Sequence, residues 1–279
     1  MIVVSTNLVD PDMWHKFQAK AWEREPYHVA RADCDYYADL FTTSDQDHLL
    51  ALPFDRSRMV VSRTKERPIQ PQMLRTAYDL GYTIVITNVD ELCPKLSALK
   101  QAVGACIPHR IACNIFLTPP YAQGFPGHWD NHDIFALQVL GQKHWVFHVP
   151  TIECPILKSK SLEIGLENAA REYTTEMGDL LYFPRGWIHQ AVTTAQPSAH
   201  ITFGIHVVRW VDFLVEALVR AAAQHVEFRH AVPLELDPIQ LRALIPILTD
   251  SPEFWNQLAD YWREKSQQPF ALNTRELYD

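Results

Sequence analysis

The chain has 279 residues, a hydrophobic fraction of 47% and a formal net charge of −8. This length suits one large domain, or one domain with a smaller appendage. The net negative charge argues against nucleic acid as a main ligand, because phosphate binding needs a basic surface. We therefore expect a globular protein with a sizeable core and no nucleic-acid partner.

The five cysteines are odd in number, and no two of them form a C-x-x-C pair. This usage argues against a disulfide framework and indicates a reducing compartment. The segment Met1–Ser5 lacks the basic start of a signal peptide, and no apolar run approaches the length of a membrane span. We expect a cytoplasmic protein with no membrane partner.

The first third of the chain predicts short elements of both kinds. A helix is expected over residues 11–22, with Asp10 as N-cap and Pro11 at the first helical position. Helical patterns and short β runs then alternate to about residue 105. The strands expected in this part cover 27–31, 59–62 and 82–86.

From about residue 110 to 209, the helical patterns disappear, and short apolar runs follow one another with turn residues between them. Such a pattern is typical of an antiparallel barrel or sandwich. Residues 151–170 interrupt it as a longer loop or insert. The expected strands cover 111–117, 134–140, 143–149, 180–183, 190–193 and 200–206.

Beyond Arg209 the strands stop, and apolar residues from Val211 to Ala222 recur at helical spacing. Asp237-Pro238 and Ser251-Pro252 each predict a helix start. We expect a β domain over residues 1–209, including its N-terminal helices and strands. A small helical region over 210–279 follows, with a loose tail from about Lys265.

Three residues suggest a metal site. His128 and Asp130 are two apart, so a strand would aim both side chains at one point. Downstream, Gly178 makes a turn and Gly186 bends the chain so that His189 points inward. A lone H-x-D is more often an ordinary polar pair. Two histidines and one carboxylate on one face of a metal form the set used by non-haem Fe(II) oxygenases.

Other histidines fit this site less well. His132 shares the parity of the H-x-D pair, but a polar residue at a strand end is the favoured interpretation. His144 and His148 are expected to face away from the barrel interior. Of His200 and His206, one is expected to be a satisfied core histidine and the other a residue of the pocket wall.

Lys143 and Asn114 are candidates for binding a cosubstrate. Lys143 begins a strand after a glycine turn, so it is either a solvated strand-end lysine or an inward charge near the metal. An inward lysine can bind the distal carboxylate of a dicarboxylate cosubstrate. Asn114 lies in an apolar strand, where a buried amide must be hydrogen-bonded. It contacts the same cosubstrate or satisfies backbone groups.

The motifs resemble those of the JmjC-type 2-oxoglutarate oxygenases, and within them the ribosomal oxygenases. That family carries H-x-D, F-x-x-Q-x-x-G-x-K-x-W and G-D-x-L-Y-x-P-x-G-x-x-H. Here the corresponding segments are 128–130, 135–145 and 178–189. The resemblance implies a mainly β fold with flanking helices: a double-stranded β-helix of the jelly-roll or cupin type. It also implies that the helices after the barrel mediate homodimerisation.

The same resemblance implies roles for the candidate residues. His128, Asp130 and His189 would bind Fe(II), Lys143 would pair with the C5 carboxylate of 2-oxoglutarate, and Asn114 would contact that cosubstrate. With O2, such a site hydroxylates a carbon of a peptide or protein side chain, and histidine or arginine is the leading target. The alternative is hydroxylation of a free amino acid or small natural-product metabolite. A non-catalytic cupin-like binding module is less expected, because the triad and the lysine are both present.

The substrate is the least defined part of the prediction. Ribosomal oxygenases continue into a winged-helix domain, whereas about 45 residues remain here after Pro233. A ribosomal protein and a biosynthetic peptide are therefore both retained as substrates. Four aromatic residues flank the metal motifs and form either a stacking pocket for a planar side chain or ordinary core. They are Tyr121, Phe125, Trp129 and Trp187.

Overall fold

The protein is described by a computed structural model that falls into two compact units. One comprises residues 1–107 and 111–206, and the other 108–110 and 207–279. The structure describes residues 11–51, 57–61, 65–107, 109–159, 168–232, 242, 244–247 and 252–266.

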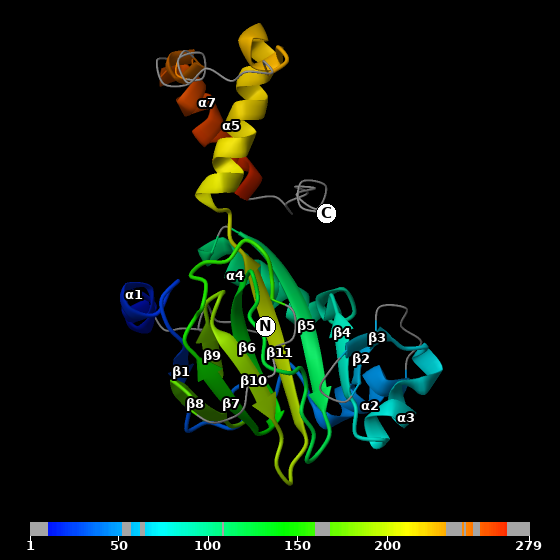
Figure 1. Ribbon diagram of the computed structural model, residues 1–279. Helices are drawn as coiled ribbons and strands as arrows, with labels where there is room; N and C mark the ends of the chain where they lie inside the picture. The colour runs from blue at the N-terminus through cyan, green and yellow to red at the C-terminus, as the bar shows by residue number, and fades with distance from the viewer. Residues whose placement is uncertain are drawn as a thin grey trace. The chain divides into compact units, whose positions relative to one another are not determined.

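The helices of the first unit precede most of its strands (Figure 1). In Figure 1, α1 lies near β1, whereas α2 and α3 lie at the other end of the unit beside β2 and β3. The helical elements are α1 (Pro11–Lys20), α2 (Thr43–Ala51), η1 (Pro71–Met73), α3 (Leu74–Asp79), η2 (Val89–Glu91) and α4 (Pro94–Cys106).

Two sheets make up the β part of this unit. The larger has eight strands in the order β1-β9-β6-β11-β5-β4-β2-β3, and the smaller has the order β10-β7-β8. The first set comprises β1 (Tyr27–Val29), β9 (Leu180–Phe183), β6 (Asp133–Gly141), β11 (Ser198–His206), β5 (Arg110–Thr118), β4 (Thr83–Thr87), β2 (Ser57–Val61) and β3 (Lys65–Pro68). The second comprises β10 (Ile188–Val192), β7 (Lys143–His148) and β8 (Arg171–Thr175).

One apolar cluster joins the two sheets. It contains Ile134 and Phe183 from the large sheet, and Trp145, Phe147 and Ala191 from the small one. The opposite face of β6 and β9 is covered as well, because Phe135 and Tyr182 pack against Phe17 of α1. Burial on both faces explains why these two strands are continuous apolar runs rather than alternating ones. The antiparallel pairing and the packed sheets confirm the fold class that the sequence indicated.

The elements lie close to the expected ones, and most differences are shifts of a few residues at their ends. The first helix ends at Lys20 instead of residue 22, and Asp10 lies outside the described residues. The strand β8 was not predicted, because Arg171–Thr175 has largely polar and exposed residues. It occupies the edge of the small sheet, where polar residues are tolerated because one side has no partner strand.

The second unit is helical. It contains α5 (Trp210–Gln224), η3 (Val226–Arg229) and α7 (Pro252–Ser266). Ala217 and Ala221 of α5 pack against Phe254 and Leu258 of α7. The predicted helix start at Asp237-Pro238 lies outside the described residues, whereas α7 begins at Pro252 as expected. Within the described residues, no helix combines the length and apolar character needed to cross a membrane.

Candidate metal centre

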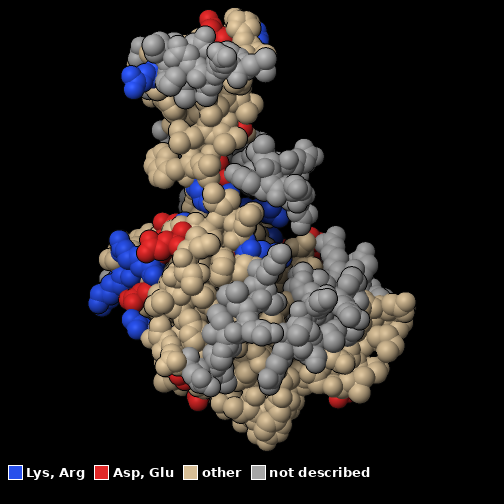
Figure 2. Space-filling view, viewed as in Figure 1, with Lys and Arg blue, Asp and Glu red and all other residues tan. Residues whose placement is uncertain are grey.

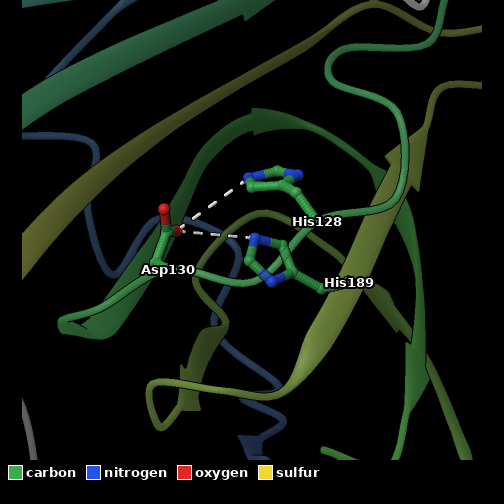
Figure 3. Close-up of side chains that lie close together, drawn as sticks. All are labelled: His128, Asp130 and His189. Atoms are coloured by element: carbon green, nitrogen blue, oxygen red, sulfur yellow. Dashed lines mark ion pairs between the residues drawn. The ribbon is translucent and has the colours of Figure 1, made fainter. Parts of the chain in front are cut away.

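His128, Asp130 and His189 come together at one point, as the spacing predicted (Figure 3). Nε2 of His189 lies 3.7 Å from Oδ2 of Asp130, and Nε2 of His128 lies 4.0 Å from the same oxygen. One ligand atom from each residue fits within 4.8 Å of the others. The three side chains therefore offer two imidazole nitrogens and one carboxylate oxygen to a single cation.

The H-x-D pair is not part of a regular strand, contrary to the expectation. His128 instead forms an isolated antiparallel bridge with His189. The backbone N–H of His128 donates to the carbonyl of His189 at 3.2 Å, and the reverse bond measures 2.8 Å. This short pairing is enough to bring the two ligand segments side by side.

The ring orientation of both histidines is fixed by backbone carbonyls. Nδ1 of His128 lies 2.8 Å from the carbonyl oxygen of Pro126, and Nδ1 of His189 lies 3.0 Å from that of Trp187. A carbonyl oxygen can only accept, so each Nδ1 carries the proton and each Nε2 lone pair is directed to the site. Metal-binding histidines commonly use such a second contact.

The protonation states suit a cation. Burial is the largest influence on the His189 pKa and, with His128, lowers it to about 4. For Asp130, burial would raise the pKa, but His132, His128 and His189 outweigh it and lower the pKa to about 2. At neutral pH the site thus holds a neutral His189 imidazole and an ionised carboxylate, the forms that metal ligands require.

The turn before His189 is held by a buried ionic network. Nη1 of Arg185 donates to Oδ1 of Asp133 at 2.9 Å, and the Arg185 backbone N–H donates to the same oxygen at 3.1 Å. Arg185 also pairs with Glu23. The Tyr182 hydroxyl donates to the other Asp133 oxygen at 2.9 Å. Because the Asp133 side chain is fully buried, loss of its cation would leave an uncompensated charge.

The N-terminal segment supports this turn and also the Gly178-Asp179 turn before β9. Asp179 accepts from the Arg31 backbone N–H at 2.8 Å and lies 2.8 Å from Nε2 of His28. Nε1 of Trp187 donates to the carbonyl of Arg24 at 2.8 Å. Gly178 has φ +94°, and a Cβ there would lie 2.2 Å from the carbonyl oxygen of Asp33. The G-D motif is therefore fixed by contacts to residues more than 140 positions earlier.

Lys143 is buried, which rules out a solvated strand-end lysine. Only 2% of the residue is exposed, and its Nζ donates to Oγ1 of Thr118 at 2.9 Å. Burial lowers its pKa to about 7, and no acidic side chain in the described part of the chain offsets that effect. A buried ammonium with a neutral partner is an incomplete ion pair, so an anionic ligand would supply the missing charge.

Asn114 lies on the same face of β5 as Phe116 and Thr118, since alternate residues of a strand share a face. Its Oδ1 accepts a hydrogen bond from the backbone N–H of Asn88 at 3.3 Å, and Asn88 has φ +52°. Asn114 thus satisfies a backbone group, which was one of the two expected alternatives. Contact with a cosubstrate stays a prediction.

His200 lies beside Phe116 of β5 and close enough to Lys143 to sense its charge. Its ring stacks on Phe116 with centroids 4.8 Å apart and meets Trp145 edge-on at 5.1 Å. Burial, followed by the charge of Lys143, lowers its pKa well below the usual value. Its Nδ1 is buried and has no hydrogen-bond partner among the described residues. Of the two environments expected for His200 and His206, an unpartnered nitrogen at His200 favours the pocket wall over a satisfied core position.

The remaining histidines lie outside the triad. His132 stacks on His206 with centroids 4.6 Å apart. His144 pairs with Glu172 at 3.4 Å. His144 and His148 have the strand parity opposite to Lys143, as expected.

The aromatic residues near the motifs take different environments. Trp187 is buried in the cluster between the sheets, in agreement with the core alternative. Tyr121 is 81% exposed. The Phe125 ring lies 5.3 Å from that of His128, which places it beside the metal ligands.

Sequence reasoning missed several supporting residues. Thr118, the partner of Lys143, could have been found because it shares the strand parity of Asn114. Arg185 and Asp133 carry no comparable signal, because their pairing with each other and with Glu23 depends on tertiary contact between distant segments.

The comparisons with known proteins agree with this geometry. Residues 92–213 match the JmjC domain family. A bifunctional lysine-specific demethylase and histidyl-hydroxylase NO66 from Culex quinquefasciatus is 33% identical over 244 residues, covering 79% of this chain and 37% of that protein. Ribosomal oxygenase 1 from Homo sapiens is 32% identical over 257 residues, covering 81% and 38%. The chain thus spans about two fifths of the length of these relatives.

Solved structures support the fold. The ribosomal oxygenase YcfD from Escherichia coli, in complex with cobalt and 2-oxoglutarate, aligns with a TM-score of 0.60 over 91% of this chain and 70% of that chain. The sequence identity of 18% makes this a likeness of fold alone. Together with the family match and the relatives above, it confirms the resemblance drawn from the motifs. The chain contains a JmjC domain like that of the ribosomal oxygenases.

Proposed function

We propose that this chain is an Fe(II)- and 2-oxoglutarate-dependent oxygenase that hydroxylates a carbon of a peptide or protein side chain. The observation that carries the proposal is the convergence of two histidines and one aspartate with their free ligand atoms within 4.8 Å. A donor set of two imidazoles and one carboxylate leaves positions on the metal for cosubstrate and oxygen.

The chain's own residues prepare the site for iron. The carbonyls of Pro126 and Trp187 hold the two imidazoles in the tautomer that presents Nε2. The lowered pKa of Asp130 keeps its carboxylate ionised. When bound, iron with 2-oxoglutarate and O2 supplies the oxidising power to hydroxylate an unactivated C–H bond, placing one oxygen atom in the product and one in succinate as CO2 is released.

Lys143 is assigned to the C5 carboxylate of 2-oxoglutarate. The assignment is supported by its burial and by the lack of an acidic partner in the described residues. Thr118 positions the ammonium by accepting one of its hydrogen bonds. Asn114 lies on the same strand face and is assigned to the same cosubstrate. The YcfD structure with cobalt and 2-oxoglutarate supports this choice of cosubstrate.

The substrate is assigned to a protein or peptide, with histidine or arginine as the modified residue. The names of the relatives, which include histidyl-hydroxylase and ribosomal oxygenase, support this class. The net charge of −8 would attract a basic partner through its long-range field. A ribosomal protein and a biosynthetic peptide both satisfy these conditions.

The C-terminal helical region, residues 210–279, is assigned to homodimerisation. Trp210, Leu214 and Leu218 follow one face of α5 at intervals of four residues, and all three are exposed. On the face drawn in Figure 2, the described part of this unit shows few charged residues. A contiguous apolar stripe of this kind marks an interaction surface, and a symmetric dimer is the commonest arrangement.

We also assign the protein to the cytoplasm. All five cysteines are free thiols, as a reducing compartment would require.

The test of function offers histidine- and arginine-containing peptides, ribosomal proteins and free amino acids side by side, with iron, 2-oxoglutarate and oxygen. We expect a mass increase of about 16 Da on a peptide or protein, accompanied by stoichiometric succinate, since hydroxylation adds one oxygen atom. The Asp130→Ala variant serves as the control and should give neither product. Oxidation of a free amino acid alone would instead support the small-molecule alternative.

A further inference from the structure

The loop after β7 runs beside both segments that carry the metal ligands. The backbone N–H of Ser159 donates to the carbonyl of Trp129 at 3.1 Å, and the Asn131 amide donates to the carbonyl of Ile156 at 3.0 Å. These contacts place residues 156–159 along the edge of the H-x-D segment that His189 does not occupy.

The same loop approaches the turn before His189. A Cβ at Gly186 would lie 2.7 Å from the carbonyl oxygen of Ile152 and 2.9 Å from Cδ of Pro155. The Gly186 backbone N–H in turn donates to the carbonyl of Asp130 at 3.0 Å. Residues 152–159 therefore border the metal centre along two of its sides.

Three side chains of this loop are apolar and exposed, and we call them the apolar rim. They are Ile152 at 53%, Ile156 at 41% and Leu157 at 58% exposed. Val149, at 61%, precedes them. The other large exposed apolar side chains of the first unit are separated along the chain. Several such residues on one short loop indicate a binding surface rather than chance exposure.

The loop is anchored by its backbone rather than by these side chains. The carbonyls of Ile152, Ile156 and Leu157 face Gly186, Asn131 and Trp129 respectively. The exposed part of these apolar side chains is unfavourable in water, at about 25 cal/mol for each Å² that remains uncovered. A ligand that covers them gains that free energy.

We infer that the apolar rim binds a bulky apolar residue of the substrate peptide, close in sequence to the residue that is hydroxylated. This inference rests on the proposed function and narrows its substrate class. The loop contacts Trp129, Asn131 and Gly186, which lie close to the metal ligands in sequence. Because an extended peptide advances only about 3.3 Å per residue, the positions to test are those next to the modified residue.

The experiment uses the full-length protein loaded with Mn(II) and 2-oxoglutarate without oxygen, so that binding is measured without turnover. The probes are fluorescent 11-residue peptides with a central histidine or arginine and with leucine, alanine or asparagine at the three flanking positions on either side. All three flanking residues are uncharged, so the acidic character of the protein does not influence the comparison. Fluorescence anisotropy reports the Kd of each peptide.

The wild-type protein should bind the best leucine-flanked peptide about tenfold more tightly than its asparagine counterpart, equivalent to ~1.4 kcal/mol. Replacing Ile156 and Leu157 together by serine should bring this ratio close to one. The backbone carbonyls that anchor the loop remain, so the melting temperature and the circular dichroism spectrum of this variant should stay close to those of the wild type. Leu157→Met should retain the preference, and Leu80→Ser, at an exposed apolar residue after α3, provides the matched control.

Each of the remaining outcomes contradicts either this inference or the proposed function. If peptides are hydroxylated but leucine-flanked ones bind no more tightly than asparagine-flanked ones, the inference is overturned and the proposed function stands. The same holds if the preference for leucine survives the double serine replacement. A smaller particle mass for the serine variant in light scattering would show that a second copy of the chain covers the apolar rim. If no peptide with a central histidine or arginine is bound or hydroxylated, the proposed function fails, and this inference fails with it.

Discussion

Lys143→Met would remove a buried positive charge while keeping most of the side-chain volume. In the structure the residue is 2% exposed, and its ammonium donates a hydrogen bond to the neutral hydroxyl of Thr118. Losing one charge-assisted contact to the C5 carboxylate should cost roughly 1.5–3 kcal/mol, or about ten- to a hundredfold in 2-oxoglutarate affinity. The affinity for the metal itself should change little.

The same substitution should stabilise the protein in the absence of cosubstrate. Burial lowers the Lys143 pKa from 10.5 to about 7, so at pH 8 the unfolded chain keeps a proton that most folded molecules have lost. This difference costs roughly 3 kcal/mol, because one pH unit corresponds to about 1.4 kcal/mol. Since the unfolded state binds more protons between pH 7 and 10.5, this contribution to wild-type stability rises with pH in that window. The methionine variant should lack it.

The pH dependence of binding has the opposite sign. The C5 carboxylate favours the charged ammonium, so above pH 7 the wild-type protein must take up a proton to bind 2-oxoglutarate. Its affinity should then fall by up to about tenfold per pH unit, whereas the methionine variant should show no such slope from this residue.

Calorimetric titration of the Mn(II)-loaded protein between pH 6 and 9 measures the 2-oxoglutarate affinity and its pH dependence. Urea unfolding without cosubstrate over the same pH range measures the stability, and Lys95→Met at an exposed lysine is the control in both. Equal 2-oxoglutarate affinity in the wild-type and Lys143→Met proteins would refute the assignment. A methionine variant that is less stable than the wild type would show that the buried charge has another partner.

Three further outcomes are expected. His128→Ala and Asp130→Ala should each abolish iron-dependent turnover while circular dichroism stays native; full activity in either would reject the metal assignment. Arg185→Met should destabilise the protein by about 3–5 kcal/mol in urea unfolding because Asp133 is left as a buried unpaired charge, and a change under 1 kcal/mol would contradict that account. Light scattering at micromolar concentration should report twice the chain mass of 32.2 kDa, and a clean monomer would contradict the dimer proposal.

The residues that converge on the candidate metal centre could be predicted because their signals are local. His128 and Asp130 are two positions apart, and His189 follows two glycines whose positive φ bends the chain. The inward direction of Lys143 was one of two alternatives that its position at a strand start left open, and the burial of the residue decides between them.

Other features could not be predicted, because they depend on which distant segments meet. The single bridge between His128 and His189 replaces the strand that the H-x-D pair was expected to occupy. The unpartnered nitrogen of His200 results from stacking on Phe116 of another strand. No periodicity in a single segment encodes either contact.

The contacts of the N-terminal segment have a consequence for the smallest piece of chain that can assemble the site. The family match begins at residue 92, yet Glu23 and Arg24 contact the turn that delivers His189, through Arg185 and Trp187 respectively. A fragment cut to the family boundary would keep all three ligands and lose the residues that fix one of them. Glu23 lies 69 positions before residue 92, where the family match begins. A truncated or recombined protein that keeps the metal centre therefore needs about seventy residues ahead of the family boundary.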